Sequence, residues 1–146
     1  MIDIIKESNE NYIGTINLPY PDNLQATNKN NKLNMPKYRE CVIYVYGDEG
    51  SNIPHFHLFE KTSPKDPKTS CAIMIDDNRY FYHNSYRGNL NNKQCRILND
   101  WMNQIYPGEN VNNWTRIKDA WNNGANANRL VTCTQPSYNH IKPYIE

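Results

Sequence analysis

Two histidines separated by one residue are the feature of this chain best suited to chemistry. They stand in the segment Pro54-His55-Phe56-His57, and residues 54–60 have a composition typical of a β-strand. Side chains alternate across a strand, so His55 and His57 are expected to project from the same face. Imidazole has an unperturbed pKa near neutrality and is the commonest metal ligand. The pattern predicts acid–base catalysis, metal binding or ligand binding at this strand, but it does not indicate a particular reaction.

The segments around the histidines also have strand and turn patterns. Residues 12–18 and 40–46 are rich in β-branched and aromatic residues, and residues 70–76 are strongly apolar. Asp77-Asn78 is predicted to form a two-residue hairpin turn that leads into a further strand over 79–82. Together these segments predict an antiparallel meander.

The periodicity then becomes helical. Asn91 and Gln94 form a capping-box pattern, and a second helix is expected to open near Asn112 or Asn113 and to end at 122–124. The apolar residues at helical spacing are Leu98, Trp101, Met102 and Ile105, followed by Trp114, Ile117 and Trp121. They predict the faces that pack into the core.

These patterns predict the α+β class, with an antiparallel sheet of three to five strands and two helices packed on one face. A length of 146 residues is typical of one domain, residues 1–146. Residues 131–134 are expected to form an edge strand in the tail.

Placing the apolar residues of neighbouring strands on one face sets a register for the sheet. Ile43 then lies opposite Leu58, and Ile75 opposite Phe56, on the face that receives the helices. The other face should carry two rows with His83 near their end: Tyr46, His55, Asp76 and Arg79 in one, and Tyr44, His57, Met74 and Phe81 in the next. A shift by one residue would turn every side chain of a strand to the other face.

The predicted cluster suggests roles for its members. His55 and His57 are candidate catalytic acid–base residues, and Arg79 would stabilise negative charge. The candidate ligand-binding residues are Tyr44, Tyr46, Asp76 and His83. No cofactor is predicted. A divalent metal is the alternative, with His55, His57 and Asp76 as ligands. The plainer interpretation is that the histidines are half-exposed strand residues bonded to loop backbone, and that the tyrosines are strand formers.

Composition excludes several classes of function. A formal net charge of +1 gives no global field that would steer the chain to nucleic acid or an anionic membrane. The four cysteines include no Cys-x-x-Cys pair, so a thiolate zinc site has no support. The N-terminal residues do not resemble a signal peptide, and no apolar run is long enough to span a bilayer. We expect a cytoplasmic protein with reduced thiols, in a bacterial cell or a phage-infected host.

Several pieces of the chain occur in the order seen in a group of small bacterial proteins of unknown function built around a Pro-His-aromatic-His core. The pieces are Tyr44-Val45-Tyr46, Pro54-His55-Phe56-His57, Leu90-Asn91-Asn92-Lys93-Gln94, Trp101 and Asn113-Trp114. The chain resembles this group over about residues 40–123, with 1–39 and 124–146 as extensions. The resemblance implies a small α+β domain with a role in bacterial conflict or regulation. Members are often encoded beside small partner proteins, as in toxin–antitoxin pairs, and occur on mobile elements and prophages.

Three functions stay open, and the sequence does not decide whether the protein is an enzyme. The first is an interaction protein of bacterial or phage conflict systems, either a toxin–antitoxin-like component or a phage-encoded inhibitor of a host factor. The second is a small hydrolase, ribonuclease-like or metal-dependent, that uses His55 and His57. The third is a binder of a nucleotide or an anionic small ligand. Binding ranks above catalysis, and a protein partner ranks above RNA or a nucleotide.

Overall fold

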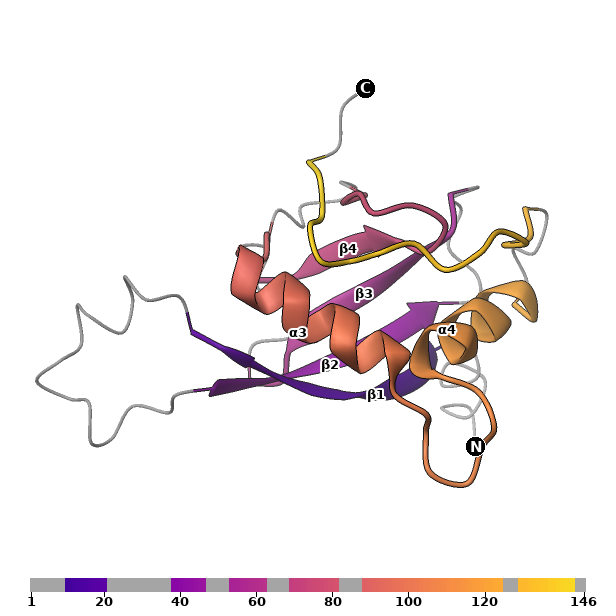
Figure 1. The fold of residues 1–146 in the computed structure, drawn as a ribbon, viewed down its shortest axis with the longest axis horizontal. Coiled ribbons are helices and arrows are strands. Elements are labelled where there is room, and N and C mark those ends of the chain that lie inside the picture. The colour runs from indigo at the N-terminus through magenta and orange to yellow at the C-terminus, as the bar shows by residue number, and fades with distance from the viewer. Residues whose placement is uncertain are drawn as a thin grey trace, which may run out of the picture.

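A computed structural model describes residues 10–20, 38–46, 53–62, 69–81, 88–124 and 129–143. These residues form an antiparallel sheet in the order β1-β2-β3-β4, together with two helices (Figure 1). The elements are β1 Glu10–Pro19, β2 Tyr38–Tyr46, β3 His55–Glu60, β4 Cys71–Met74, α3 Asn92–Asn103 and α4 Asn113–Asn122. The predicted α+β class, with an antiparallel sheet and two helices against it, is confirmed.

The first two strands show how apolar spacing selects the core face. On β2, Cys41, Ile43 and Val45 are buried while the residues between them are partly exposed, as period-two alternation requires. On β1 the buried residues Ile13 and Ile16 are three apart. A β-bulge between Tyr12 and Gly14 adds one residue there, which restores the alternation beyond it.

The predicted register is confirmed between β2 and β3 but is wrong between β3 and β4. Ile43 pairs with Leu58, as expected. On the other side of β3, Phe56 pairs with Ile73 instead of Ile75. The offset is two residues, so each side chain keeps its face but changes its neighbours.

The prediction of a two-residue hairpin turn at Asp77-Asn78 is also wrong. Residues 75–78 form the connection, and Tyr80 makes an isolated bridge to Ile73. The expected strand over 79–82 is reduced to such bridges in its described part, and Tyr82 lies outside the described residues. The carbonyl of Ile75 instead accepts hydrogen bonds from the Trp114 and Tyr138 side chains. These bonds fix the chain where a tight turn was expected.

Both helices begin at the predicted caps. Asn91 and Gln94 form a capping box, with bonds of 2.8 Å in each direction. The Gln94 side chain also donates to the carbonyl oxygen of Pro19 at 2.7 Å, which ties α3 to the end of β1. The Asn112 side chain caps α4 by accepting from the backbone of Thr115. Neither described helix has the length and apolar character needed to cross a membrane.

The predicted helix faces are buried with one exception. Leu98, Trp101, Met102, Trp114, Ile117 and Trp121 lie in the core. Ile105 is 60% exposed, because α3 ends at Asn103 and Gln104 adopts an extended conformation. The expectation that Ile105 continues the apolar stripe of the helix is therefore wrong.

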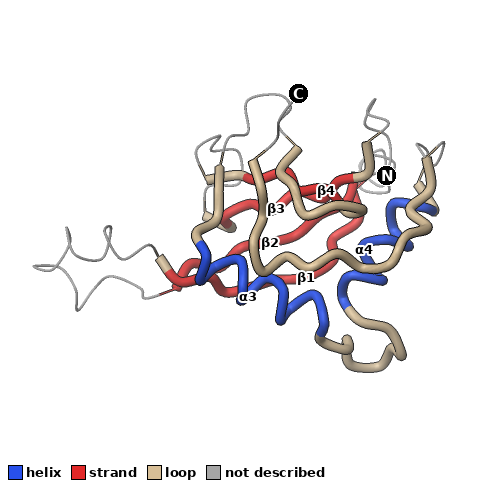
Figure 2. Tube along the Cα trace, turned by 45° about the horizontal axis from the view of Figure 1, so that its top comes forward, coloured by secondary structure: helices blue, strands red, loops and turns tan. Residues whose placement is uncertain are grey.

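The C-terminal segment 129–143 crosses the sheet over β3 and β4, beside α3 (Figures 1 and 2). The edge strand predicted at 131–134 is not present in this described segment. Side chains hold the tail instead: Asn122 bonds to both backbone groups of Val131, and the Tyr138 hydroxyl donates to Met74 and Ile75 carbonyls. The helices and this tail together cover the core face.

Candidate functional site

The two histidines lie on the same face of β3, opposite Phe56 and Leu58, as predicted. Their ring centroids are 5.0 Å apart. The Tyr46 ring meets His57 edge-on at 4.9 Å, and Tyr44 is the register partner of His57. We name the six residues of this group the histidine cluster: Tyr44, Tyr46, His55, His57, Phe59 and Phe81.

Burial of the histidine cluster differs from what the sequence suggested. His55 and His57 are each 1% exposed, so the interpretation of both as half-exposed residues is wrong. His57 packs between Tyr46 and Phe59, with the Phe59 ring stacked at 5.6 Å. Aromatic neighbours of this kind contribute a large buried area. The pair therefore contributes to packing, whatever other role it has.

The environment of His55 identifies Nδ1 as a ring nitrogen that carries a proton. Nδ1 lies 2.7 Å from the carbonyl oxygen of Ile53, and because a carbonyl only accepts, Nδ1 donates. The rings of Phe81 and Trp121 lie 4.6 and 5.8 Å from the imidazole. The expected bond from a histidine to loop backbone is thus present. It orients the ring inside an aromatic enclosure.

Asp76 and Arg79 do not form the predicted row with His55. Met74 occupies the position opposite His55 that was expected for Asp76. The Asp76 carboxylate lies 3.7 Å from Arg129, and Arg79 donates to Asp77 at 2.8 Å. The cause is the two-residue offset of β4, which places both charged residues beyond the strand.

The remaining candidates for the site can be placed only in part. Among the described residues, no group of three His, Cys, Asp or Glu side chains could hold a metal ion. The set His55, His57 and Asp76 is therefore not assembled. His83 lies outside the described residues.

The face that carries the histidine cluster is uneven in exposure. Over β3 and β4 its residues are buried, Met74 among them. Over β1 and β2 it is partly open, with Tyr12 53% exposed and Tyr44 and Tyr46 half-buried. The Tyr44 and Tyr46 rings are nearly parallel, at 13° and 6.0 Å. The accessible part of the cluster is thus its tyrosines.

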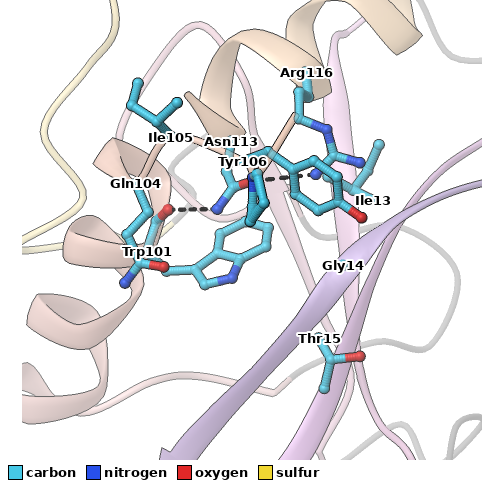
Figure 3. A pocket seen from close by; sticks show the side chains of 10 residues that line it. Ile13, Gly14, Thr15, Trp101, Gln104, Ile105, Tyr106, Asn113 and Arg116 are labelled. Atoms are coloured by element: carbon cyan, nitrogen blue, oxygen red, sulfur yellow. Dashed lines mark hydrogen bonds between the residues drawn. The ribbon is translucent and has the colours of Figure 1, made fainter. Parts of the chain in front are cut away.

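A second site lies at the outer edge of β1 (Figure 3). A pocket of about 210 Å³ is lined by residues 13–15 of β1, Trp101, residues 104–107, Asn113 and Arg116. Its rim is apolar where Ile105 and Tyr106 are exposed, at 60% and 41%. We call it the edge pocket. It combines an aromatic floor, an exposed apolar rim and one cation.

Gly14 permits the floor of the edge pocket to form. A Cβ atom at position 14 would lie 2.9 Å from Cζ2 of Trp101, closer than real side-chain carbons approach. The indole therefore occupies space that any other residue would fill. A glycine inside a strand often marks a bulge or a close approach, and Gly14 marks both.

Arg116 has three neighbours at the edge pocket. Its guanidinium lies over the Tyr106 ring at 3.8 Å, and Nη1 donates to Asn113 Oδ1 at 3.1 Å. Nε lies 3.7 Å from Glu109 Oε2. Asn113 in turn donates to the Trp101 carbonyl at 2.8 Å. Figure 3 shows the Arg116–Asn113 and Asn113–Trp101 hydrogen bonds along one wall of the pocket, beside the Tyr106 ring.

Two features of the sequence belong to the edge pocket. Gly14 interrupts an otherwise regular strand pattern, and Tyr106-Pro107-Gly108, a pattern that ends a helix, places an aromatic residue in a turn. The histidine pair indicates which residue types are present, but it carries no information on their burial. The pocket residues come from β1, from the end of α3 with the loop that follows it, and from α4, so the fold must bring residues 13–15 beside residues 101–116.

Three of the four cysteines are buried, and Cys133 is exposed. Burial raises the pKa of the Cys41 thiol to about 11, against a smaller lowering effect of Arg39. Burial likewise raises the pKa of Cys71 to about 12. A thiol is nucleophilic as its thiolate, so neither residue is suited to nucleophilic chemistry.

Comparisons with known proteins found no match for this chain among protein-family models, curated proteins or solved structures.

Proposed function

We propose that this protein is a small interaction protein that binds a partner through the surface around the edge pocket. The main support is Ile105, a 60% exposed aliphatic side chain at the rim of the pocket. Tyr106, beside it, is also exposed. Exposed apolar groups gathered beside a pocket are typical of binding sites, and aromatic residues are enriched in interfaces.

The strand beside the pocket adds support. β1 spans ten residues and pairs only with β2 among the described strands. β1 contains no Lys or Arg, and the features that can protect its edge are Glu10 and Pro19 at its two ends and the bulge near Gly14. Residues 15–18 carry neither a charge nor a proline. A partner segment could therefore pair with this edge.

The biological setting is a further part of the proposal. A place in bacterial or phage conflict systems rests on the resemblance of the Pro-His-Phe-His segment, and of the pieces that follow it, to the group of small bacterial proteins named above. In that setting the protein would be a toxin–antitoxin-like component or a phage-encoded inhibitor of a host factor. Both roles require a protein partner.

The test compares two exposed aliphatic residues. The tagged parent chain should capture a partner protein from bacterial lysate. The tagged Ile105→Asp variant should fail to capture it, because a charge at the rim of the pocket opposes apolar contact. Leu130→Asp is the matched control, since Leu130 is 53% exposed and does not line the pocket. Both variants should keep the circular dichroism spectrum of the parent. The captured protein would then be purified and its binding measured by calorimetry. Equal binding by both variants would contradict the proposal.

A second candidate function is binding of a nucleotide or anionic small ligand at the tyrosines of the histidine cluster. The nearly parallel, partly exposed rings of Tyr44 and Tyr46 support it, because bases stack on such rings. Titration with nucleotides, followed by tyrosine fluorescence in the parent and in Tyr44→Leu, tests it. Hydrolysis at His55 and His57 has less support, because both rings are 1% exposed.

A further inference from the structure

Arg116 has a fixed orientation and uncommitted donors. Arginine carries five N–H donors in a planar fork, and the described contacts use Nη1 for Asn113. The distance of 3.7 Å from Nε to Glu109 is too long for a hydrogen bond. Stacking on Tyr106 holds the plane of the guanidinium. A fork held in this way matches a carboxylate in geometry and charge.

Glu109 occupies the neighbourhood of this fork without binding it closely. Its side chain is about half exposed, and the adjoining Gly108 has a φ of 86°, which glycine adopts readily. The Arg116 side chain is 16% exposed and that of Glu109 is 47% exposed; an ion pair that is partly open to solvent and lacks a hydrogen bond contributes little stability. A carboxylate from outside could therefore replace Glu109 on Arg116 at low cost.

We infer that the edge pocket binds the carboxylate of an acidic side chain in an extended segment of a partner protein. The inference rests on the interaction function proposed above. The carboxylate would replace Glu109 on Arg116, and an apolar neighbour would pack on Ile105 and Tyr106. The backbone of the segment would pair with the outer edge of β1 near Gly14. The charge complementarity with Arg116 selects an acidic occupant.

The experiment uses two capped peptides that differ in one group. N-acetyl-Thr-Val-Glu-Val-Thr-amide and its Gln counterpart are titrated into the full ¹⁵N-labelled chain and followed by two-dimensional NMR. The Glu peptide should shift the amides of 13–15 and 104–106 and the Arg116 Nε–H signal. It should bind about tenfold more tightly than the Gln peptide, as expected for hydrogen bonds to charged groups.

Two variants should change this preference in opposite directions. Arg116→Gln should abolish the preference for Glu over Gln, whereas Arg96→Gln, an exposed arginine of α3 outside the pocket, should keep it. Glu109→Gln removes the competing carboxylate and should strengthen binding of the Glu peptide about two- to fivefold. Because Glu109 is exposed, this variant keeps the test valid even if Arg116→Gln folds poorly.

Equal affinity for the two peptides, or no shifts at millimolar peptide, would overturn the inference. So would weaker binding in Glu109→Gln. None of these outcomes alters the capture result for Ile105→Asp, so the inference and the proposed function fail separately.

Discussion

The histidine cluster and the edge pocket are opposites in accessibility. The cluster holds the residues best suited to acid–base or ligand chemistry, yet its two imidazoles are buried. The edge pocket is built from ordinary residues, yet its rim residues Ile105 and Tyr106 are exposed. β3 is an inner strand and β1 an edge strand. Residue type therefore indicates what chemistry is available, while position in the sheet decides what a partner can reach.

The largest expected effect comes from Leu58, which shares β3 with the histidines but faces the core. Leu58→Ala should lower the free energy of unfolding by about 2–5 kcal/mol, because it leaves a cavity among fully buried side chains. Urea unfolding followed by tryptophan fluorescence measures this loss. A loss well under 1 kcal/mol would mean that the core face is less tightly packed than described.

His57→Ala tests whether the histidine cluster is structural. We expect a loss of about 1–3 kcal/mol, because a buried ring between Tyr46 and Phe59 is removed. His140→Ala is the control, since His140 is exposed. Partner binding should survive in the folded variant. Unchanged stability together with lost binding would reverse the comparison and make the cluster the functional site.

Gly14→Ala tests the floor of the edge pocket. The new methyl group would meet Trp101 at 2.9 Å, and overpacking of this kind costs about 1–3 kcal/mol. Adding Trp101→Phe to the same chain should recover part of the loss, because the clashing atom belongs to the outer ring of the indole. A neutral Gly14→Ala would show that Trp101 moves freely, and the pocket would lose its fixed floor.

The buried thiol of Cys41 should make the stability of the protein depend on pH. The pKa of Cys41 is raised from 9.0 to about 11 by burial, so the folded state holds the proton more tightly than the unfolded state. Stability is therefore complete below pH 9 and falls as the pH rises toward 11. Relative to Cys41→Ala, the parent should lose about 1–2 kcal/mol more over this interval in urea unfolding. Parallel pH profiles for the two chains would contradict the burial of this thiol.

Local sequence was sufficient to determine where the helices begin and which face each strand residue occupies. The capping box of Asn91 and Gln94 and the cap at Asn112 depend on neighbouring residues, so their pattern was sufficient. Strand alternation likewise placed His55 and His57 on the face opposite Leu58. The β2–β3 register followed because one register alone buries the apolar residues of both strands.

Tertiary structure decided the features that depend on distant partners. A two-residue shift of β4 relative to β3 keeps the same residues on the buried face, so the alternation of apolar residues could not reveal it. Because of this shift, Met74 and not Asp76 lies opposite His55. The end of α3 two residues before Ile105 depends on packing against α4, where the Asn113 amide donates to the Trp101 carbonyl. Burial of the histidines and exposure of Ile105 are properties of the assembled surface. Alternation assigns a side chain to a face, but only the rest of the fold decides whether that face is covered.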